Sequence, residues 1–239
     1  SFPVTTQSNE AQKWFDRGLL WTYGYNHEEA VMCFERAIDA DPKCAMAYWG
    51  AGYAAGPNYN MPWDLFDDAG RATAARAGFD HARKALDLID SVTGWEAALI
   101  QALPARHPQP DPLEPEAMKA WDADFADAMR NGFAVHPESH EVRTVFAEAL
   151  LNLTPWKMWD LPSGKPAAGA RTVEAQTVLE EALEGDPSAM QHPGLLHLYV
   201  HLMEMSPFPE KALKAGDALR RLVPDAGHLI HMPTHVDVL

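Results

Sequence analysis

The chain has 239 residues, of which 47% are hydrophobic and 10% aromatic, so it can bury enough surface for one large core or a continuous stack of repeats. Its formal net charge of −15 would repel a polyanion, and no stripe of Lys and Arg offsets that charge, so we exclude nucleic acid as a partner. No run approaches the roughly 18 apolar residues of a membrane span, and no signal-like segment opens the sequence, so we expect a cytoplasmic protein without a membrane partner.

A repeat of about 34 residues is visible near the start of the sequence. Apolar residues recur at helical spacing through residues 9–42, and a proline closes the unit: Trp14, Gly18, Trp21, Ala30, Phe34, Ala37 and Pro42. This spacing predicts two antiparallel helices, each with its apolar residues on one face. Pro42 ends the second helix because its ring nitrogen has no hydrogen to donate.

The two cysteines, Cys33 and Cys44, stand eleven positions apart without a CxxC pattern. A disulfide between them would need an oxidising compartment, so we favour buried free thiols.

A second unit begins after Pro42 and is soon interrupted. Its first helix carries Ala47, Tyr48, Gly52 and Ala55, and a loop rich in Pro, Asn and aromatic residues follows at 56–68.

Two long ordered loops separate the helices further on. Residues 104–115 hold five prolines, residues 154–170 include Trp156 and Trp159, and residues 116–153 between them predict two more helices. Loops of this length in a compact helical array are usually functional, and the alternative is that they cover the outer side of the stack.

The spacing of Ala30, Phe34, Ala37 and Pro42 recurs twice in the second half of the chain. The copies are Ala175, Leu179, Ala182 and Pro187, and then Ala212, Gly216, Leu219 and Pro224. At these positions the chain resembles the tetratricopeptide repeat, over about two thirds of its length. The resemblance implies an all-α fold, a tetratricopeptide-like helical-hairpin solenoid, and we treat residues 1–239 as one such domain.

The C-terminal end departs from the repeat pattern. A new first helix is expected after Pro224, but the sequence stops at Leu239 before a second helix could cover it. Solenoids normally end in a polar cap, so either the natural chain continues or another chain completes the last repeat.

Two groups of metal-ligand residue types lie in the repeats at about residues 188–239. His197, His201 and Glu204 fall at i, i+4 and i+7, so all three project from one face of a helix. His228, His231 and His235 fall at i, i+3 and i+7 and also share one face. Counted from Pro224, the second group takes positions that line the concave groove in tetratricopeptide arrays, and counted from Pro187, His201 of the first group does so too, so we expect the two groups to face a shared space. Helical bundles build metal sites from facing side chains in this way.

Neutral imidazole suits zinc, copper, iron and nickel, and a carboxylate with two histidines also suits non-haem iron. The zincin pattern HExxH is absent, because Leu198 follows His197. Seven residues of helix rise about 10.5 Å, which is too far for one ion to bind all three groups of a helix. We therefore expect either about four ligands on one ion or two ions in tandem. Met203, Met205 and Met232 are soft groups that would favour copper, although methionine at helical spacing is more often core.

The alternative to a metal site is that the two groups form a polar groove that binds no metal. Burying six such groups without partners would be costly, which favours metal binding. Pro233 disfavours helical geometry at Met232, so the second helix either kinks there or begins at Pro233, and His235 would then point away from His231.

The other histidines lack ligand spacing. His27 is expected to be a surface residue or a helix-start residue, and His192 is a candidate for a group that contacts the ligands rather than the metal. The rest are expected to be solvated: His81, His107, His136 and His140.

Three stretches narrow the resemblance: FPVTTQSNEAQKWFDRGLLWTYGYNHEEAVMCF, DPKCAMAYWGAGYAAGPNYN and the pattern HxxxHxxE…GHxxHMPTH. Together they resemble a group of bacterial and fungal tetratricopeptide proteins of poorly defined function. The resemblance implies the fold, and it implies a metal site through the six residues above; it carries no activity.

We therefore predict a metal-dependent enzyme, with copper or iron performing redox or oxygen chemistry on a small organic, including aromatic, substrate in the groove. Aromatic residues of the loops and of one groove helix would line that pocket: Tyr48, Trp49, Tyr59, Trp63, Trp156 and Trp159. Glu204 would serve as ligand or proton acceptor, and Tyr199 as a nearby acid. The alternatives are zinc-dependent hydrolysis or elimination, and a non-catalytic peptide scaffold or metal carrier.

Overall fold

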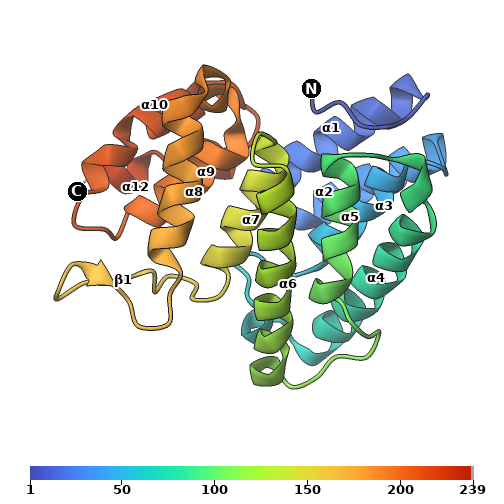
Figure 1. Ribbon diagram of the computed structural model, residues 1–239, viewed down its shortest axis with the longest axis horizontal. Helices are drawn as coiled ribbons and strands as arrows, with labels where there is room; N and C mark the ends of the chain where they lie inside the picture. The colour runs from blue at the N-terminus through green and yellow to red at the C-terminus, as the bar shows by residue number, and fades with distance from the viewer. Residues whose placement is uncertain (238–239) are drawn as a thin grey trace. The chain divides into compact units, whose positions relative to one another are not determined.

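The computed structural model describes residues 1–237, and its secondary structure is almost entirely helical (Figure 1). The predicted all-α class is confirmed. Contacts divide the chain into two compact units, unit 1 at residues 1–136 and unit 2 at residues 137–239, which are described separately. The assignment of the whole chain to one domain stays a prediction. Within residues 1–237, none of the helices combines the length and apolar character that a bilayer crossing requires.

Unit 1 is a series of helices in which chain neighbours pack against each other: α1 (Asn9–Tyr23), α2 (His27–Ala40), α3 (Ala45–Ala55), η1 (Trp63–Leu65), α4 (Asp68–Asp87), η2 (Ile89–Ser91), α5 (Trp95–Arg106) and α6 (Pro115–Val135). Side-chain caps fix several of the starts. Ser8, Asn26 and Asp67 each accept a hydrogen bond from a backbone N–H in the first turn of the helix that follows. His27 is the first residue of α2, as its position after Asn26 predicts.

Phe34 shows why the repeat alternates large and small residues. Its ring is fully buried, and a Cβ added at Gly18 of α1 or Gly50 of α3 would come within 2.7 or 2.4 Å of that ring. The two glycines therefore let three helices close on one aromatic side chain. Cys33 and Cys44 are both free and buried, which confirms that prediction.

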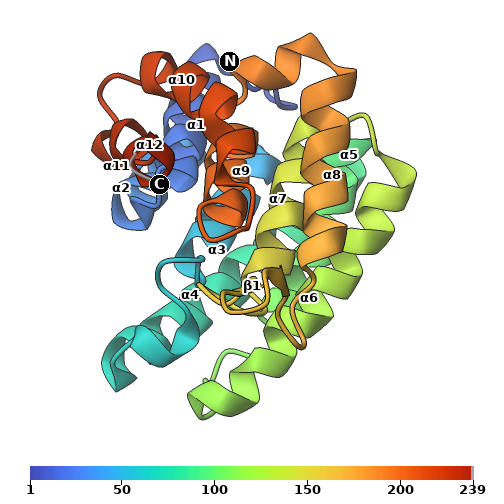
Figure 2. The ribbon, with the colours of Figure 1, turned by 90° about the vertical axis from the view of Figure 1, so that its left-hand side faces the viewer.

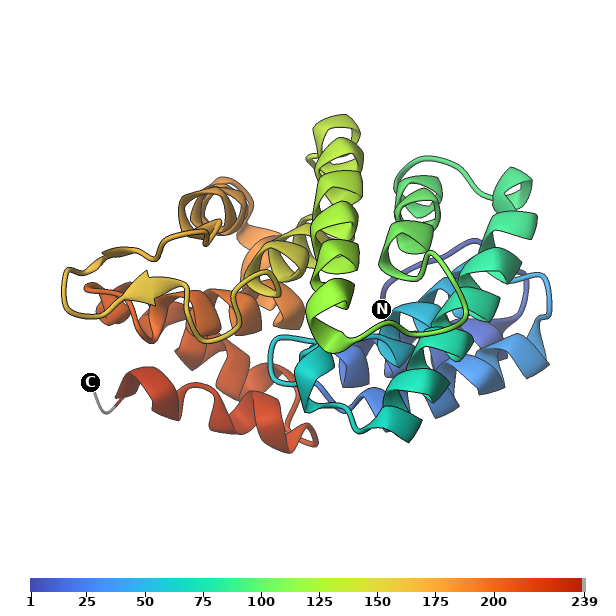
Figure 3. The ribbon, with the colours of Figure 1, turned by 90° about the horizontal axis from the view of Figure 1, so that it is seen from below.

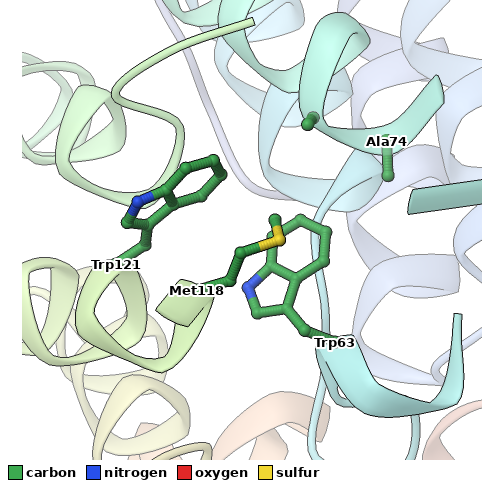
Figure 4. Close-up of a cluster of buried hydrophobic side chains, with 5 residues drawn as sticks. Trp63, Ala74, Met118 and Trp121 are labelled. Atoms are coloured by element: carbon green, nitrogen blue, oxygen red, sulfur yellow. The ribbon is translucent and has the colours of Figure 1, made fainter. Parts of the chain in front are cut away.

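The loop after α3 is tied to the core of unit 1 by Arg106. This buried guanidinium donates to the Pro57 carbonyl and lies over the rings of Tyr53 and Phe125, at 4.6 and 4.9 Å from the ring centroids. A second cluster lies beside it, where the indoles of Trp63 and Trp121 meet edge to face at 6.2 Å. Figure 4 shows Met118 reaching toward Trp63 in this cluster.

The proline-rich loop is shorter than its sequence predicts. Helix α5 continues through Pro104 to Arg106, so the loop begins at His107, and Pro115 already occupies the first turn of α6. Pro104 cannot donate to the Ile100 carbonyl, and the helix ends two residues after it, at Arg106. The expectation that His107 is solvated is wrong, since its side chain is 1% exposed.

Unit 2 contains the remaining elements: α7 (His140–Leu151), β1 (Trp159–Asp160), β2 (Lys165–Pro166), α8 (Thr172–Gly185), η3 (Pro187–Gln191), α9 (Pro193–Met203), η4 (Pro209–Ala212), α10 (Leu213–Leu222), α11 (Gly227–His231) and α12 (Thr234–Asp237). Helix α9 packs against α7, α8 and α10, and α10 packs against α11 and α12. Figure 2 shows these C-terminal helices gathered around α9.

The repeated apolar positions of unit 2 are buried as the spacing predicts: Ala175, Leu179 and Ala182 on α8, and Ala212 and Leu219 around α10. Gly216 stands where the earlier copies have Phe34 and Leu179. A Cβ at Gly216 would lie 3.3 Å from Cβ of Pro233, so glycine leaves room for the chain that returns against α10.

The second long loop carries the β1–β2 hairpin, in which Trp159 pairs with Pro166 (Figure 3). The Trp159 indole N–H donates to the Leu202 carbonyl at 2.6 Å. This bond fastens the loop to the C-terminal turn of α9.

Pro233 interrupts the last helix, as its position predicts. Helix α11 ends at His231 and α12 begins at Thr234, yet Met232 keeps helical dihedrals of φ −52° and ψ −41°. The Nε2 atoms of His235 and His231 still lie 3.0 Å apart, so the predicted divergence of the two side chains is wrong. The uncovered end predicted at Leu239 lies outside the described residues.

Candidate metal centre

Helix α9 supplies the buried half of the centre. Pro193 occupies its first position, where the missing N–H costs nothing. The Nδ1 atom of His192 accepts from the Leu195 N–H at 3.2 Å and so caps the helix. Every residue from Pro193 to Met203 is buried, which fixes the orientation of the histidines between them. His192 thus starts the helix that carries two of the candidate ligands, and its predicted contact with the ligands stays a prediction.

His197, His201 and His228 form a triad that could hold a metal ion. One ligand nitrogen from each lies within 4.8 Å of the other two. His197 and His201 come from successive turns of α9, and His228 from α11. His197 Nε2 lies 3.0 Å from His228 Nε2, and the ring centroids of His197 and His201 are 4.6 Å apart. The triad is buried on the α9 side, where His197 is 1% and His201 3% exposed.

A second pair of imidazoles lies on the solvent side of the triad. His231 Nε2 is 3.0 Å from His235 Nε2, and the His235 ring centroid lies 6.3 Å from that of His201. His231 is exposed and His235 half-buried.

The spacing of both nitrogen pairs suits a coordination sphere. Two nitrogens bound to one ion at about 2.0–2.1 Å lie roughly 2.9 Å apart at a right angle and roughly 3.4 Å apart at the tetrahedral angle. The separations of 3.0 Å in the pairs His197–His228 and His231–His235 fall in this range.

Glu204 lies between the two groups. Its Oε1 is 3.0 Å from His201 Nδ1, and its Oε2 contacts His235 Nδ1. An ionised carboxylate only accepts hydrogen bonds, so each Nδ1 atom carries the proton toward Glu204, and in a neutral ring Nε2 then presents a lone pair. Metal-binding histidines are commonly oriented by a carboxylate in this manner. The geometry thus supports a positioning role for Glu204, beside the predicted roles of ligand and proton acceptor.

The electrostatic setting favours the neutral form of His201 and His228. Burial lowers the pKa of His201 well below its ordinary value, and the neighbouring His228 and His235 lower it further. Burial, with His231 and His235 adding to it, lowers the pKa of His228 to about 4. Burial raises the pKa of Glu204, and the hydrogen bond with His235 opposes that rise. Neutral imidazole is the form that binds metal.

Tyr199, the predicted acid, faces a different helix. Its hydroxyl donates to Glu180 of α8 at 2.9 Å, whereas His197 and His201 on either side of it face α11. Burial and Glu180 raise the pKa of the Tyr199 hydroxyl. A phenol held in this way is a poor proton donor.

The predicted aromatic pocket is largely core. Trp49 stacks on Tyr53 at 5.2 Å, and Trp49, Tyr59 and Trp63 are all 1–2% exposed. These aromatic residues stabilise unit 1 by packing. Near the metal centre, sequence spacing missed the bond from Trp159 to Leu202, because the two residues are brought together only by the hairpin.

Comparison of the chain with protein-family models, with curated proteins and with solved structures finds no match.

Proposed function

We propose that this protein is a metal-dependent enzyme whose transition-metal ion is held by His197, His201 and His228. The observation that carries the proposal is the convergence of three imidazole nitrogens within 4.8 Å, two of them on a wholly buried helix. Three protein ligands leave coordination positions for water, oxygen or substrate, which is the arrangement of a catalytic rather than a structural site.

The donor set favours copper or iron and redox chemistry on a small organic substrate. Imidazole suits both metals, and the triad contains no carboxylate that would compensate the charge on the ion directly. When bound, such an ion supplies one-electron or oxygen chemistry. The chain's own residues hold the ion, keep the imidazoles in one tautomer through Glu204 and exclude bulk water on the α9 side.

Zinc-assisted hydrolysis or elimination is the second candidate. Three histidines without a directly bound carboxylate also form a known catalytic zinc set, in which the ion lowers the pKa of bound water to about 7. Glu204, already on His201, would tune the basicity of the ligand in this case too.

The proposed scaffold for the centre is a tetratricopeptide-like stack of helix pairs. The repeated residues Ala30, Phe34 and Ala37 on α2 and Ala175, Leu179 and Ala182 on α8 are all buried, which supports equivalent packing roles for the two helices. In such a stack, neighbouring helices bring side chains far apart in sequence to one face, as α9 and α11 do here.

The direct test is metal analysis of protein made without a histidine tag, before and after loading with Fe(II), Cu(II) or Zn(II). We expect at least about one tightly held ion per chain in the wild type, and a sharp loss of bound metal in His197→Ala. The matched control is His81→Ala, which removes a half-buried histidine of α4 in unit 1. Less than about a tenth of an ion per chain would contradict metal binding altogether.

A second measurement separates the two chemistries. We expect visible or electron-spin-resonance signals of the iron or copper form to change when oxygen and small aromatic molecules are added. If such signals stay constant while the zinc form alone hydrolyses test esters or amides, zinc chemistry replaces the redox proposal.

A further inference from the structure

We infer that the centre has a second metal position, formed by His231 and His235 on the solvent side and coupled to the buried triad through Glu204. This inference rests on the proposed metal binding of the triad. The second position is more exposed than the triad and has fewer protein ligands, and Glu204 links the two positions.

The second position is defined by its two ligand nitrogens. His231 and His235 stand one helical turn apart, and their Nε2 atoms are separated by 3.0 Å across the break at Pro233. The Thr234 hydroxyl donates to the His231 carbonyl at 2.7 Å, which holds the turn in which both rings converge. Two histidines one turn apart can chelate one ion, with water completing the coordination.

Glu204 orients one imidazole at each of the two positions in the same way. It contacts the Nδ1 atom of His201 through one oxygen and the Nδ1 atom of His235 through the other. Each imidazole is therefore anchored at Nδ1 and presents Nε2 to an ion. Because one carboxylate serves both rings, a change at either position is transmitted through Glu204 to the other.

The two positions should differ in how they release metal. The triad has three protein nitrogens and lies on a buried helix, whereas the pair has two and an exposed ring at His231. An ion from solution reaches the pair first and leaves it first. We expect the metal ion to exchange fast at His231–His235 and slowly at the triad, because the triad has more protein ligands.

The test titrates Co(II) into metal-free protein and then removes it with a chelator. Co(II) absorbs in the visible range, so both binding and release can be followed. We expect two ions per chain and two phases of release in the wild type. His231→Ala should lose the fast phase and keep the slow one, because His231 is exposed and its removal leaves the buried triad in place. His81→Ala should keep both phases.

Glu204→Gln tests the coupling. Glutamine keeps the shape but offers one acceptor oxygen and a donor amide, so it cannot accept from both Nδ1 atoms. We expect affinity to fall about 10-fold to 100-fold at both positions. An effect confined to one position would overturn the shared role of Glu204.

The possible results separate this inference from the proposed function. One ion per chain that leaves in a single slow phase, unchanged in His231→Ala, overturns the second position and leaves the triad intact. An absence of any bound Co(II) overturns both. Circular dichroism of each variant shows whether a lost phase reflects lost ligands or lost fold.

Discussion

Both units bury histidines, but they do so in different ways. In unit 1 the ring of His107 lies against Gly78 and meets the edge of Trp63, with ring centroids 6.2 Å apart. In unit 2 the rings of His197 and His201 face other imidazoles. Burial lowers the pKa of His107 to about 3 and also lowers that of His201. Burial and a lowered pKa therefore do not distinguish a ligand from a core histidine; convergence of ring nitrogens does.

The carboxylates of the two units differ in the same manner. Asp122 in unit 1 is buried near Arg106, and burial raises its pKa to about 7 despite that positive charge. Glu204 in unit 2 is shared by two imidazoles. The Asp122 carboxyl costs folding stability as pH rises toward its raised pKa, whereas Glu204 orients two imidazoles of the candidate metal centre.

The largest expected effect distinguishes His197, a candidate metal ligand, from His107, a core histidine. His197→Ala should abolish chelator-resistant metal binding, a loss of more than about 100-fold in affinity, because it removes a direct ligand. His107→Ala should instead lower the free energy of unfolding by roughly 2–4 kcal/mol and leave metal content unchanged. Metal analysis and urea unfolding check the pair. Loss of metal in His107→Ala would contradict the distinction between the core histidine and the candidate ligand.

Next in size is the response of unit 1 to pH. The folded state holds the Asp122 proton with a pKa of about 7, against 3.8 for the ordinary carboxyl, so the folded state binds more protons between these values. Stability contributed by this group therefore falls as pH rises from about 4 to 7. Asp122→Asn should be more stable than wild type at pH 8, by up to about 4 kcal/mol, and should lose this pH dependence. Urea unfolding at pH 5 and pH 8 measures both, and equal stability at pH 8 would contradict it.

A smaller effect is expected from the packing under His107. A Cβ at Gly78 would lie 2.3 Å from atoms of the His107 ring, so Gly78→Ala should destabilise the protein by about 1–3 kcal/mol. The control is Gly185→Ala at the end of α8, where a Cβ meets nothing within 4 Å and should be neutral or stabilising by about 0.4–1 kcal/mol. Thermal unfolding of the two variants gives the comparison. If both behave alike, His107 is not held by close packing.

The smallest expected effect is at the start of α9. His192→Ala removes the Nδ1 acceptor for the Leu195 N–H and should cost about 1 kcal/mol in the free energy of unfolding. His192→Asn should recover most of that loss, since asparagine caps helices well. Equal losses in both variants would show that His192 acts through packing instead.

Local sequence patterns were sufficient for the helices and for the candidate ligands. The spacing of Ala30, Phe34, Ala37 and Pro42 and its two copies predicted helices whose repeated apolar residues are buried, because helical periodicity and proline act over a few neighbouring positions. The spacing of His197 and His201 placed two ligands on one face for the same reason. The i to i+7 span also indicated that one ion cannot take all six groups.

Tertiary structure decided the rest, because it depends on contacts between residues far apart in the chain. Pro233 disfavours a helix locally, but it packs closely over Gly216, and His235 two residues later contacts Glu204. The His107 ring can be buried because Gly78 has no side chain to occupy the same space. Nothing in the local sequence pattern connects these two positions. Tyr199 lies between two candidate ligands in sequence, yet the helix turns it toward Glu180. The sequence thus determined which residues could bind a metal, and the packing of α9 against its neighbours determined which of them meet.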